Sequence, residues 1–544
     1  MNKNTIPTAV SCLLLVSIAV LLFTECLMNL TPPISRDALI HHLAIPKLWI
    51  KHGGLYEIPW AKYSYYPMNI DLLYLACLYF KKDIAPKFIH LAFALGTGLL
   101  IYIHLKMRFS RNWGLLGVLI FLSTPIIIRL STSAYVDLGL IFFTTASVLS
   151  FVQWQDGKYK QMKWFIFSAV SMGLAAGCKY NGLIPWVFVN LMLIFYFARD
   201  TQKQVSALNC GLLFFALSLV TVSPWYIKNY LFTSNPIYPL FDNIFNPSNH
   251  PGSLSKSSGM GFFQKRELMY GETFWETLFI PLRMFFQGHD NSDQYFDGVL
   301  NPILIVMSPF AFYNKRLRRN TLFFTAFTAY FLICAFFLTV PRVRYILPVV
   351  PLLAIVATTG IKALIDHFMQ RKGFILYAGI MVTIVITTFF LGSNWLYLKN
   401  HFDAIQPIKY ISGEETKDQF LARHIGSYPA TEYINKNLPT NVKIFLMFMA
   451  GRGYYLDRDY CHESSFGMGF IEQLVKKAAV SEADFITYLQ SQEFSHIFMR
   501  TDLFEKYLAD NFKEETILRF LALKRKYWKQ VYESKGYMVL EMLK

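Results

Sequence analysis

Long apolar runs separated by short polar stretches dominate roughly the first 390 residues of the chain. Runs of about 16 to 22 residues are long enough to cross a bilayer as helices. We expect helices because backbone groups inside hydrocarbon must be hydrogen-bonded within their own segment, and because the runs lack the alternation of barrel strands. The runs predict about eleven spans, at residues 8–29, 86–105, 113–130, 137–153, 163–178, 183–198, 206–224, 300–313, 321–340, 345–361 and 373–392.

Basic residues in the loops between these runs set the expected orientation. Loops rich in Lys and Arg stay on the cytoplasmic side of a membrane. Placing them there predicts a cytoplasmic N-terminus and an extracytoplasmic C-terminus. The first apolar run lacks a convincing small-residue cleavage site, so we expect it to be retained as a span and not removed as a signal peptide. The basic loops are KMRFSRN (106–112), DGKYKQMK (156–163), RDTQK (199–203), NKRLRRN (314–320), and Lys362 with Arg371 and Lys372.

Three longer segments are expected on the outer side. The first, residues 30–85, includes an apolar piece at 69–80 that is too short to span, so we expect amphipathic helices lying on the outer face. The second, residues 225–299, is rich in Asn, Pro, Gly and aromatic residues, and the third is the polar tail. The chain is therefore divided into a membrane domain, 1–392, and an extracytoplasmic domain, 393–544.

The tail alternates between helix and strand patterns. The stretches EYINKNL and DFITYLQSQ predict helices, and NVKIFLMF, SHIFMR and YMVLEML predict strands. A tail of this size can form a small α/β domain. The expected fold class is mainly α: a polytopic helical membrane protein with a large first outer loop and a C-terminal extracytoplasmic α/β domain.

Composition supports the membrane class and narrows the partners. The chain is 54% hydrophobic and only 16% charged, against roughly 25% charged in soluble proteins. The net charge of +17 follows largely from the basic loops, so it calls for anionic lipid and not for nucleic acid. The 7 cysteines show no CxxC or metal-ligand spacing and predict no disulfide framework.

Polar and ionisable residues converge on the outer ends of the predicted spans. Asp37 lies in the first outer loop and Asp137 at the outer mouth of a span, and both are candidate catalytic residues. Charged groups at membrane depth are energetically unfavourable and mark substrate pathways. The candidates for substrate binding are His42, Lys179, Tyr180, Lys228, Asn229, Arg342, Arg344 and Tyr345.

These residue types suit one kind of reaction. A carboxylate can act as general base toward a hydroxyl group. Cations can hold a phosphate and stabilise it as a leaving group, and Tyr and Trp can stack on sugars or headgroups. Together they indicate transfer from a phosphorylated, membrane-embedded donor to a nucleophile that arrives from outside.

Each candidate also has a structural alternative. Asp37 can pair with Arg36 or cap the following helix, and Asp137 can cap the span that starts near it. Lys179 can be a snorkelling interface residue, and the arginines of VPRVRY can bind lipid headgroups. Asp37 and His41 are one helical turn apart, a spacing that suits a metal but is common by chance.

Several stretches resemble a known group of enzymes. DALIHHLAIPKLWIKHG with YSYYPMNIDLLY, followed by STSAYVDL, GLAAGCKYNGL, PWYIKNYLFTSNPIYPLF and RYILPVVPLLAI, resembles the family-39-like bacterial members of the GT-C glycosyltransferases. These are the relatives of protein mannosyltransferases, of ArnT and of the RgtA/B/C/D transferases. The resemblance covers most of residues 30–360, and it rests on the order and sidedness of the motifs.

The resemblance implies an inverting transfer from a sugar linked to polyprenyl phosphate or pyrophosphate, without a nucleotide cofactor. It places Asp37 as the first-loop acid, which acts as base or positions the acceptor, and Asp137 as the second-loop acid. It makes Lys179, Lys228 and Arg344 candidates for the donor phosphate. Some members use a divalent metal between such acids, and the sequence leaves this open.

The acceptor also stays open, as lipid A, core oligosaccharide, another glycan or a protein. The family resemblance favours a bacterial inner membrane. Two further functions are compatible with the sequence: a transporter or flippase of lipid-linked glycans, and a glycan polymerase, ligase or scaffold. Transporters often carry repeated halves, and no such repeat is visible here.

Overall fold

The computed structural model describes residues 5–247, 261–338, 340–462 and 468–543. The chain divides into two compact units. The first unit comprises Met1–Leu30, Pro67–Ile70 and Pro86–Pro407, and the second comprises Thr31–Tyr66, Asp71–Ala85 and Ile408–Lys544.

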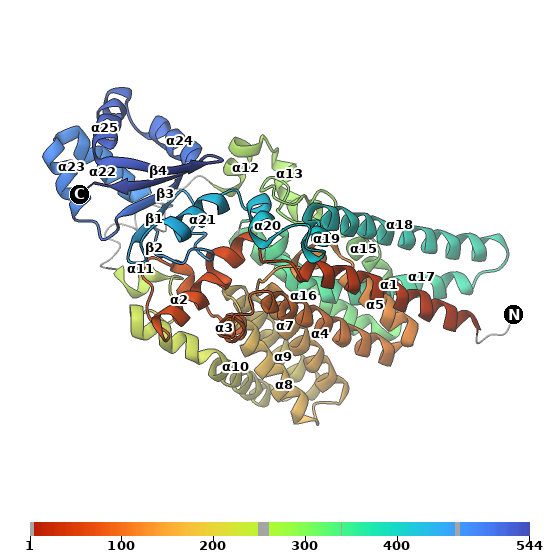
Figure 1. The fold of residues 1–544 in the computed structure, drawn as a ribbon. Coiled ribbons are helices and arrows are strands. Elements are labelled where there is room, and N and C mark those ends of the chain that lie inside the picture. The colour runs from red at the N-terminus through yellow and green to blue at the C-terminus, as the bar shows by residue number, and fades with distance from the viewer. Residues whose placement is uncertain (1–4, 248–260, 339, 463–467, 544) are drawn as a thin grey trace. The chain divides into compact units, whose positions relative to one another are not determined.

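The first unit is a bundle of apolar helices, and Figure 1 shows its long helices from the side. Within the described residues, eight helices are long and apolar enough to cross a membrane, or nine if the bent pair α5–α6 forms one span. The chain is thus a polytopic membrane protein, and the predicted fold class is confirmed. The spans are α1 (Thr5–Asn29), α4 (Ala85–Arg108), α7 (Asp137–Asp156), α9 (Leu183–Thr201), α10 (Gln204–Thr233), α16 (Arg318–Leu338), α17 (Val350–Met369) and α18 (Phe374–Ile405), with the bent pair α5 (Arg111–Leu122) and α6 (Pro125–Ser131). The bundle also contains the shorter helix α8 (Met162–Ala176).

Two of the expected spans are shorter than a membrane crossing. The run at 163–178 forms α8, which ends at Ala176, and the run at 300–313 is interrupted. It forms α15 (Ile303–Val306) and then the 3₁₀ segment η6 (Ser308–Tyr313), which has a proline in its first turn. Proline lacks the N–H that an α-helix needs there, so the apolar run does not continue as one helix.

The last long helix also differs from its expected length. Helix α18 does not end at residue 392 but continues to Ile405. Its later part, SNWLYLKNHFDAI, contains polar residues, and for that reason the predicted span ended before it. It still forms a helix, because helix propensity does not require an apolar sequence. The compact units accordingly divide at Pro407.

Short elements connect the long helices of the first unit. After α10 the described chain contains four short helices, and a buried ion cluster fixes this region: Arg266 donates to both oxygens of Glu272 at 2.6 and 2.7 Å, and Arg283 donates to Oε1 at 3.1 Å. The elements are η3 (Tyr180–Gly182), α11 (Asp242–Phe245), α12 (Phe262–Tyr270), α13 (Phe274–Leu278), α14 (Ile280–Arg283), η7 (Lys315–Leu317) and η8 (Val343–Val349).

The second unit is built on a five-stranded sheet of order β2-β1-β3-β5-β4. The central strand β1 pairs in parallel with β2 and β3, and β5 pairs antiparallel with β3 and β4. The pattern-based predictions for β1, β3 and β5 are confirmed, and β2 and β4 are additional. The strands are β1 (Lys443–Met447), β2 (Asp459–Cys461), β3 (His496–Arg500), β4 (Trp528–Ser534) and β5 (Tyr537–Met542).

Alternate residues of the strands face two separate hydrophobic cores. Phe445 and Ile497 belong to one core, which contains the apolar side chains of the four helices gathered on that side of the sheet in Figure 1. Ile444 and Phe498 belong to the other, where Ile434 of α21 packs. The unit is therefore a three-layered α/β domain. Its helices are α19 (Pro407–Ile411), α20 (Lys417–His424), α21 (Tyr428–Asn437), α22 (Met468–Val480), α23 (Glu482–Gln490), α24 (Thr501–Asn511) and α25 (Glu514–Tyr527).

Most of the first outer loop, Thr31–Tyr66 and Asp71–Ala85, is part of this second unit. Leu48 and Trp60 from the loop pack against the core that contains Ile434. The loop also donates hydrogen bonds to the tail: Nζ of Lys47 bonds to the carbonyl oxygens of Tyr454 at 2.8 Å and Leu456 at 3.0 Å. The loop elements are η1 (Ala38–His42), α2 (Ala44–His52), η2 (Lys62–Tyr65) and α3 (Asn69–Tyr79).

Replacing Lys47 by Met is expected to destabilise the second unit. Nζ also lies 3.1 Å from Oδ1 of Asp457, so the substitution leaves two carbonyl groups and a carboxylate without their donor. We expect a loss of about 1–3 kcal/mol in the free energy of unfolding, measured by denaturant titration in detergent. Lys51→Met is the matched control because Lys51 forms an exposed pair with Asp459; equal losses in both variants would contradict the prediction.

Candidate active site

A buried carboxylate opens helix α7. Asp137 is the first residue of the helix and is only 1% exposed. The preceding residues 132–136, TSAYV, form no regular helix, so the chain turns into α7 at this point. The N-terminus of a helix carries a partial positive charge that favours an anion. The position therefore stabilises a charged carboxylate even though water is almost absent.

Two cations face this carboxylate from two other segments. Nζ of Lys179, just before η3, donates to Oδ1 of Asp137 at 2.9 Å, and Nε of Arg344, in η8, lies 4.0 Å from Oδ2. Lys179 also lies over the ring of Tyr345 at 5.3 Å, and the guanidinium of Arg344 lies over Tyr135 at 5.1 Å. One carboxylate and two cations leave the cluster with a net charge of +1, which attracts an anion.

A buried histidine fixes the start of α7. His90 of α4 is fully buried, and its Nδ1 lies 2.8 Å from the carbonyl oxygens of Leu130 and Ser133. Its Nε2 accepts a hydrogen bond from the backbone N–H of Leu138 at 2.9 Å. Nδ1 must donate and Nε2 must accept, so the ring is neutral with its proton on Nδ1. His90 thereby holds the helix end on which Asp137 sits.

Tyr180 and Asn229 have structural contacts. The hydroxyl of Tyr180 donates to the carbonyl oxygen of Tyr238 at 2.7 Å and accepts from Nδ2 of Asn229 at 3.1 Å. These bonds tie the end of α10 to the turn that follows it. The side chains are buried, so their contribution is to the shape of this wall.

Lys228 lies close to a second polar junction. Its Nζ lies over the ring of Trp225 at 5.1 Å, and Nε1 of Trp225 donates to Oδ1 of Asn69 at 2.7 Å. The backbone N–H of Asn69 donates to the carbonyl of Gly177 at 2.9 Å. A Cβ at Gly177 would lie 2.1 Å from Nδ2 of Asn69, so only glycine allows this close approach.

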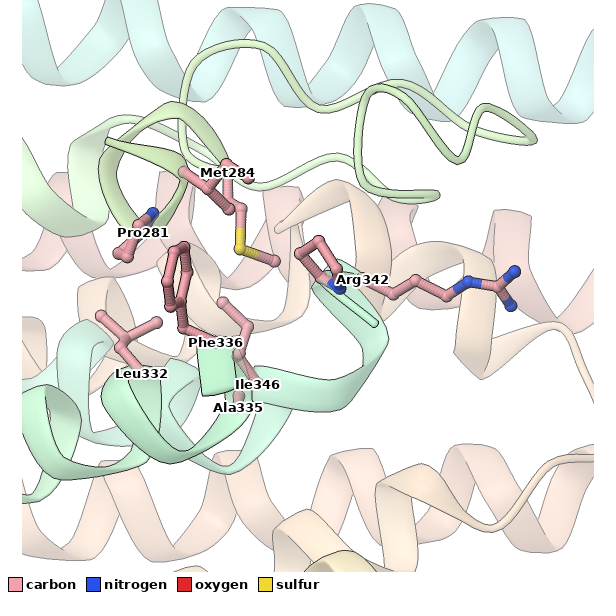
Figure 2. A pocket seen from close by; sticks show the side chains of 9 residues that line it. Pro281, Met284, Leu332, Ala335, Phe336, Arg342 and Ile346 are labelled. Carbon is pink, nitrogen blue, oxygen red and sulfur yellow. The ribbon is translucent and has the colours of Figure 1, made fainter. Parts of the chain in front are cut away.

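Arg342 pairs with a carboxylate other than Asp137. Figure 2 shows its side chain leaving a small apolar pocket formed by Pro281, Met284 and Phe336, among others. Its Nη2 donates to Oδ1 of Asp293 at 2.7 Å. Arg342 therefore fastens the segment before α15 and does not join the cluster around Asp137 in this structure.

A second ion cluster holds the same segment. Nη1 of Arg129 donates to Oδ1 of Asp290 at 2.9 Å and to Oδ1 of Asp297 at 3.0 Å. Partial burial alone would raise the pKa of Asp297, but the charge and hydrogen bond of Arg129 outweigh it, and the pKa is lowered. Three carboxylates of the segment, at positions 290, 293 and 297, are therefore held by arginines from other parts of the chain.

The remaining candidates, Asp37 and His42, lie in the second unit. Asp37 precedes η1 and is partly exposed, and its side chain makes no capping hydrogen bond to that turn. Nδ1 of His42 lies 2.8 Å from Oδ1 of the buried Asp71. Burial raises the pKa of Asp71 to about 8. The ring of His41 stacks on Tyr63 with centroids 4.4 Å apart.

The structure thus brings four of the expected residues together: Asp137, Lys179, Arg344 and Tyr345. Sequence reasoning missed His90, Tyr135 and Asn69. A histidine within an apolar run was the one available signal for His90, whereas the role of Asn69 depends on partners more than 100 positions away. Among the described residues, no group of three or more His, Cys, Asp or Glu side chains could hold a metal ion.

Comparison with known proteins identifies the class of the fold. ArnT from Cupriavidus metallidurans bound to undecaprenyl phosphate matches with a TM-score of 0.56 and 14% identity, over 97% of this chain and 97% of that chain. The archaeal oligosaccharyltransferase AglB from Archaeoglobus fulgidus, in complex with an inhibitory peptide and a dolichol-phosphate, matches with a TM-score of 0.52 and 11% identity, over 96% of this chain and 74% of that chain. The resemblance predicted from the sequence is confirmed: the chain has the fold of the GT-C class of membrane glycosyltransferases.

At the level of sequence, residues 62–236 match the family model described as dolichyl-phosphate-mannose-protein mannosyltransferase. This segment contains Asp137, Lys179, Tyr180, Lys228 and Asn229. The search of curated proteins gives no match.

Replacing Asp137 by Asn is expected to destabilise the first unit, because Lys179 and Arg344 lose the charge that compensates them. We expect a loss of about 3–5 kcal/mol in the free energy of unfolding, measured by denaturant titration in mixed micelles. Asp403→Asn is the matched control, because Asp403 forms an exposed pair with Lys399 on α18 and such pairs contribute about 0.5 kcal/mol or less. An Asp137 variant as stable as the control would contradict a role for this ion cluster.

Proposed function

We propose that this protein transfers a sugar from a polyprenyl-phosphate donor to an acceptor on the extracytoplasmic side of a membrane. The observation that carries the proposal is the cluster of Asp137, Lys179 and Arg344, in which the carboxylate is buried, the two cations are partly buried, and positive charge is in excess. A net positive site at the end of membrane helices suits a lipid phosphate. The resemblance favours a bacterial inner membrane, and the basic loops favour an N-terminus in the cytoplasm.

The two cations have a role in departure of the phosphate. As the bond between the anomeric carbon and the phosphate oxygen breaks, its electron pair stays on the oxygen and negative charge grows there. Donors that are already fixed stabilise that charge more than water does, since they need not reorganise. Lys179 and Arg344 are fixed by Asp137 and by the rings of Tyr345 and Tyr135.

The two acids then have different tasks. Asp137 is engaged with cations and almost inaccessible, so we assign it to positioning Lys179 and Arg344. Asp37 is partly exposed, and the family resemblance makes it the first-loop acid, so we assign it as the base that removes the proton from the acceptor hydroxyl. The hydroxyl oxygen attacks the anomeric carbon from the side opposite to the phosphate, and the configuration inverts.

The solved structures with this fold support the donor class. The ArnT structure holds undecaprenyl phosphate and the AglB structure holds a dolichol-phosphate, and both ligands are long isoprenoid chains with a phosphate. Charged lining groups beside long apolar helices suit the same combination here. The acceptor class is left open because AglB binds a peptide, whereas the residues around Asp137 specify no acceptor.

The proposal is tested by a transfer assay in membranes that lack the native enzyme. Radiolabelled polyprenyl-phosphate sugars are supplied to the wild type, to Asp37→Asn and to the control Asp403→Asn. A positioned base contributes about 10²–10⁴ in rate, so we expect at least a hundredfold loss in Asp37→Asn and full activity in the control. Full activity of Asp37→Asn would remove the assigned base. Label that changes leaflet in the wild type but stays on the lipid would replace the transferase by a flippase.

Arg344→Ala is expected to weaken donor binding as well as the rate. Loss of a charge-assisted phosphate contact amounts to about 1.5–3 kcal/mol, or roughly tenfold to more than a hundredfold in kcat/KM for the donor. The measurement is the initial rate at varied donor concentration. Arg316→Ala serves as control, since Arg316 is an exposed residue of the basic loop at 314–320. Equal kcat/KM in the two variants would contradict the phosphate assignment.

A further inference from the structure

A cleft opens in the second unit at the ends of two parallel strands. Strands β1 and β3 run in parallel and end at Met447 and Arg500. Their carboxyl ends therefore lie at the same edge of the sheet. In sheets of this kind, ligands bind in the crevice outside the carboxyl ends of the strands. This edge lies within the second unit, and no residue of the cluster around Asp137 belongs to it.

The cleft has the size of a small-molecule site. It encloses about 460 Å³, within the range of roughly 300–1,000 Å³ that small ligands occupy. Its walls come mainly from the segment after β1, from the end of β3 with helix α24, and from the first outer loop, which contributes Arg36. Three separate parts of the chain therefore converge on one cavity.

The walls carry more positive than negative charge. Arg36, Arg452, Arg500 and Lys506 line the cleft, whereas Asp510 is its one acidic lining residue. Arg500 is held by Asp502 through two hydrogen bonds of 2.7 Å. If Asp502 is included, the cleft has four cationic side chains and two carboxylates. Like charges brought together by folding repel one another, and a bound anion relieves that repulsion.

Backbone geometry after β1 shapes the floor of the cleft. Phe448 and Ala450, both lining residues, have φ of +57° and +54°, and Gly451 has φ of +73°. Left-handed non-glycine residues are unfavourable by roughly 1–3 kcal/mol each and occur where the surrounding structure holds them, often at ligand sites. At Gly451 a Cβ would lie 2.8 Å from the ring of His462, so the chain is held closely there.

The cleft also offers surfaces for a sugar. Tyr507, Tyr537 and Asn511 line it together with Phe448. Aromatic rings can stack on the apolar faces of a sugar, and an amide can donate to and accept from its hydroxyl groups. Cations alone would suit any anion, whereas cations beside rings and an amide suit an anionic carbohydrate.

We propose that this cleft at the carboxyl ends of β1 and β3 binds a phosphorylated sugar. The phosphate lies among Arg36, Arg452 and Lys506, and the sugar lies against the tyrosines. Arg500, already paired with Asp502, positions the wall. The site does not depend on transferase activity, and its ligand can be a free sugar phosphate or a phosphorylated sugar of a larger glycan.

The test is isothermal titration calorimetry of the full-length protein in detergent. The probes are a hexose 6-phosphate, inorganic phosphate and the neutral hexose. We expect the hexose 6-phosphate to bind with the lowest Kd, inorganic phosphate to bind more weakly, and the neutral hexose to give no heat. No binding of hexose 6-phosphate in the millimolar range overturns the proposal, and equal Kd values for it and inorganic phosphate overturn the sugar part.

Variants assign the binding to the cleft. Arg452→Gln with Lys506→Gln should raise the Kd of hexose 6-phosphate by about tenfold or more. The matched control, Arg525→Gln with Lys529→Gln, removes one Arg and one Lys from exposed positions of the same unit and should leave the Kd unchanged. Arg36→Gln alone, at an exposed loop position, gives a second reading if the double variant unfolds.

Two further measurements separate this site from the cluster around Asp137. Lys179→Gln should leave the Kd of hexose 6-phosphate unchanged, and a weakened Kd in that variant would move the binding to the first unit. The second measurement repeats the titration in detergent micelles that contain either phosphatidylglycerol or a neutral lipid. The Kd of hexose 6-phosphate should be the same in both. Competition by phosphatidylglycerol would identify a lipid headgroup as the ligand and overturn the carbohydrate assignment.

Discussion

Compensation of a buried charge is the constraint on which the candidate active site depends. Asp137 has almost no contact with solvent, and an isolated carboxylate in such a place is strongly unfavourable. The start of α7, the amine of Lys179 and the guanidinium of Arg344 together supply the compensation. Asp137 begins α7, Lys179 follows α8 and Arg344 precedes α17. The carboxylate of Asp137 therefore links the ends of three helices. The same contacts that stabilise the bundle thereby arrange its two cations.

Hydrophobic patterning predicted much of the fold, because burial in lipid depends mainly on the length and composition of a run. The pattern was less informative about where a helix ends and about short strands, because these depend on individual contacts. Helix α8 stops where Gly177 meets Asn69, and α18 continues through polar residues because nothing in them breaks a helix. Strand β2 spans Asp459–Cys461, too short to show an alternating pattern. The pairing of the first loop with the tail rests on contacts such as Lys47 with Tyr454, which no single segment reveals.

Residue type and sidedness predicted which residues could form the site. The contacts in the structure show that some of them lie together and that others have structural partners instead. Asp137, Lys179, Arg344 and Tyr345 do lie together. Tyr180 and Asn229 are polar for a different reason, because both hydrogen-bond around the carbonyl of Tyr238. A sequence shows that a polar residue is present but not whether a backbone carbonyl, a carboxylate or a ligand is its partner. Tyr135 and His90 were overlooked because an aromatic or a lone histidine in an apolar run usually belongs to the core.

The interleaving of the two units has a consequence for biosynthesis. Residues 31–66 and 71–85 emerge from the ribosome early, but the strands against which part of this loop packs lie in Ile408–Lys544 and are made last. At typical translation rates the intervening helices take on the order of tens of seconds to synthesise. During that time Leu48 and Trp60 have no sheet to cover them, so the early loop is exposed to proteases and chaperones. A chain without Ile408–Lys544 therefore leaves Leu48 and Trp60 without the core on which they pack.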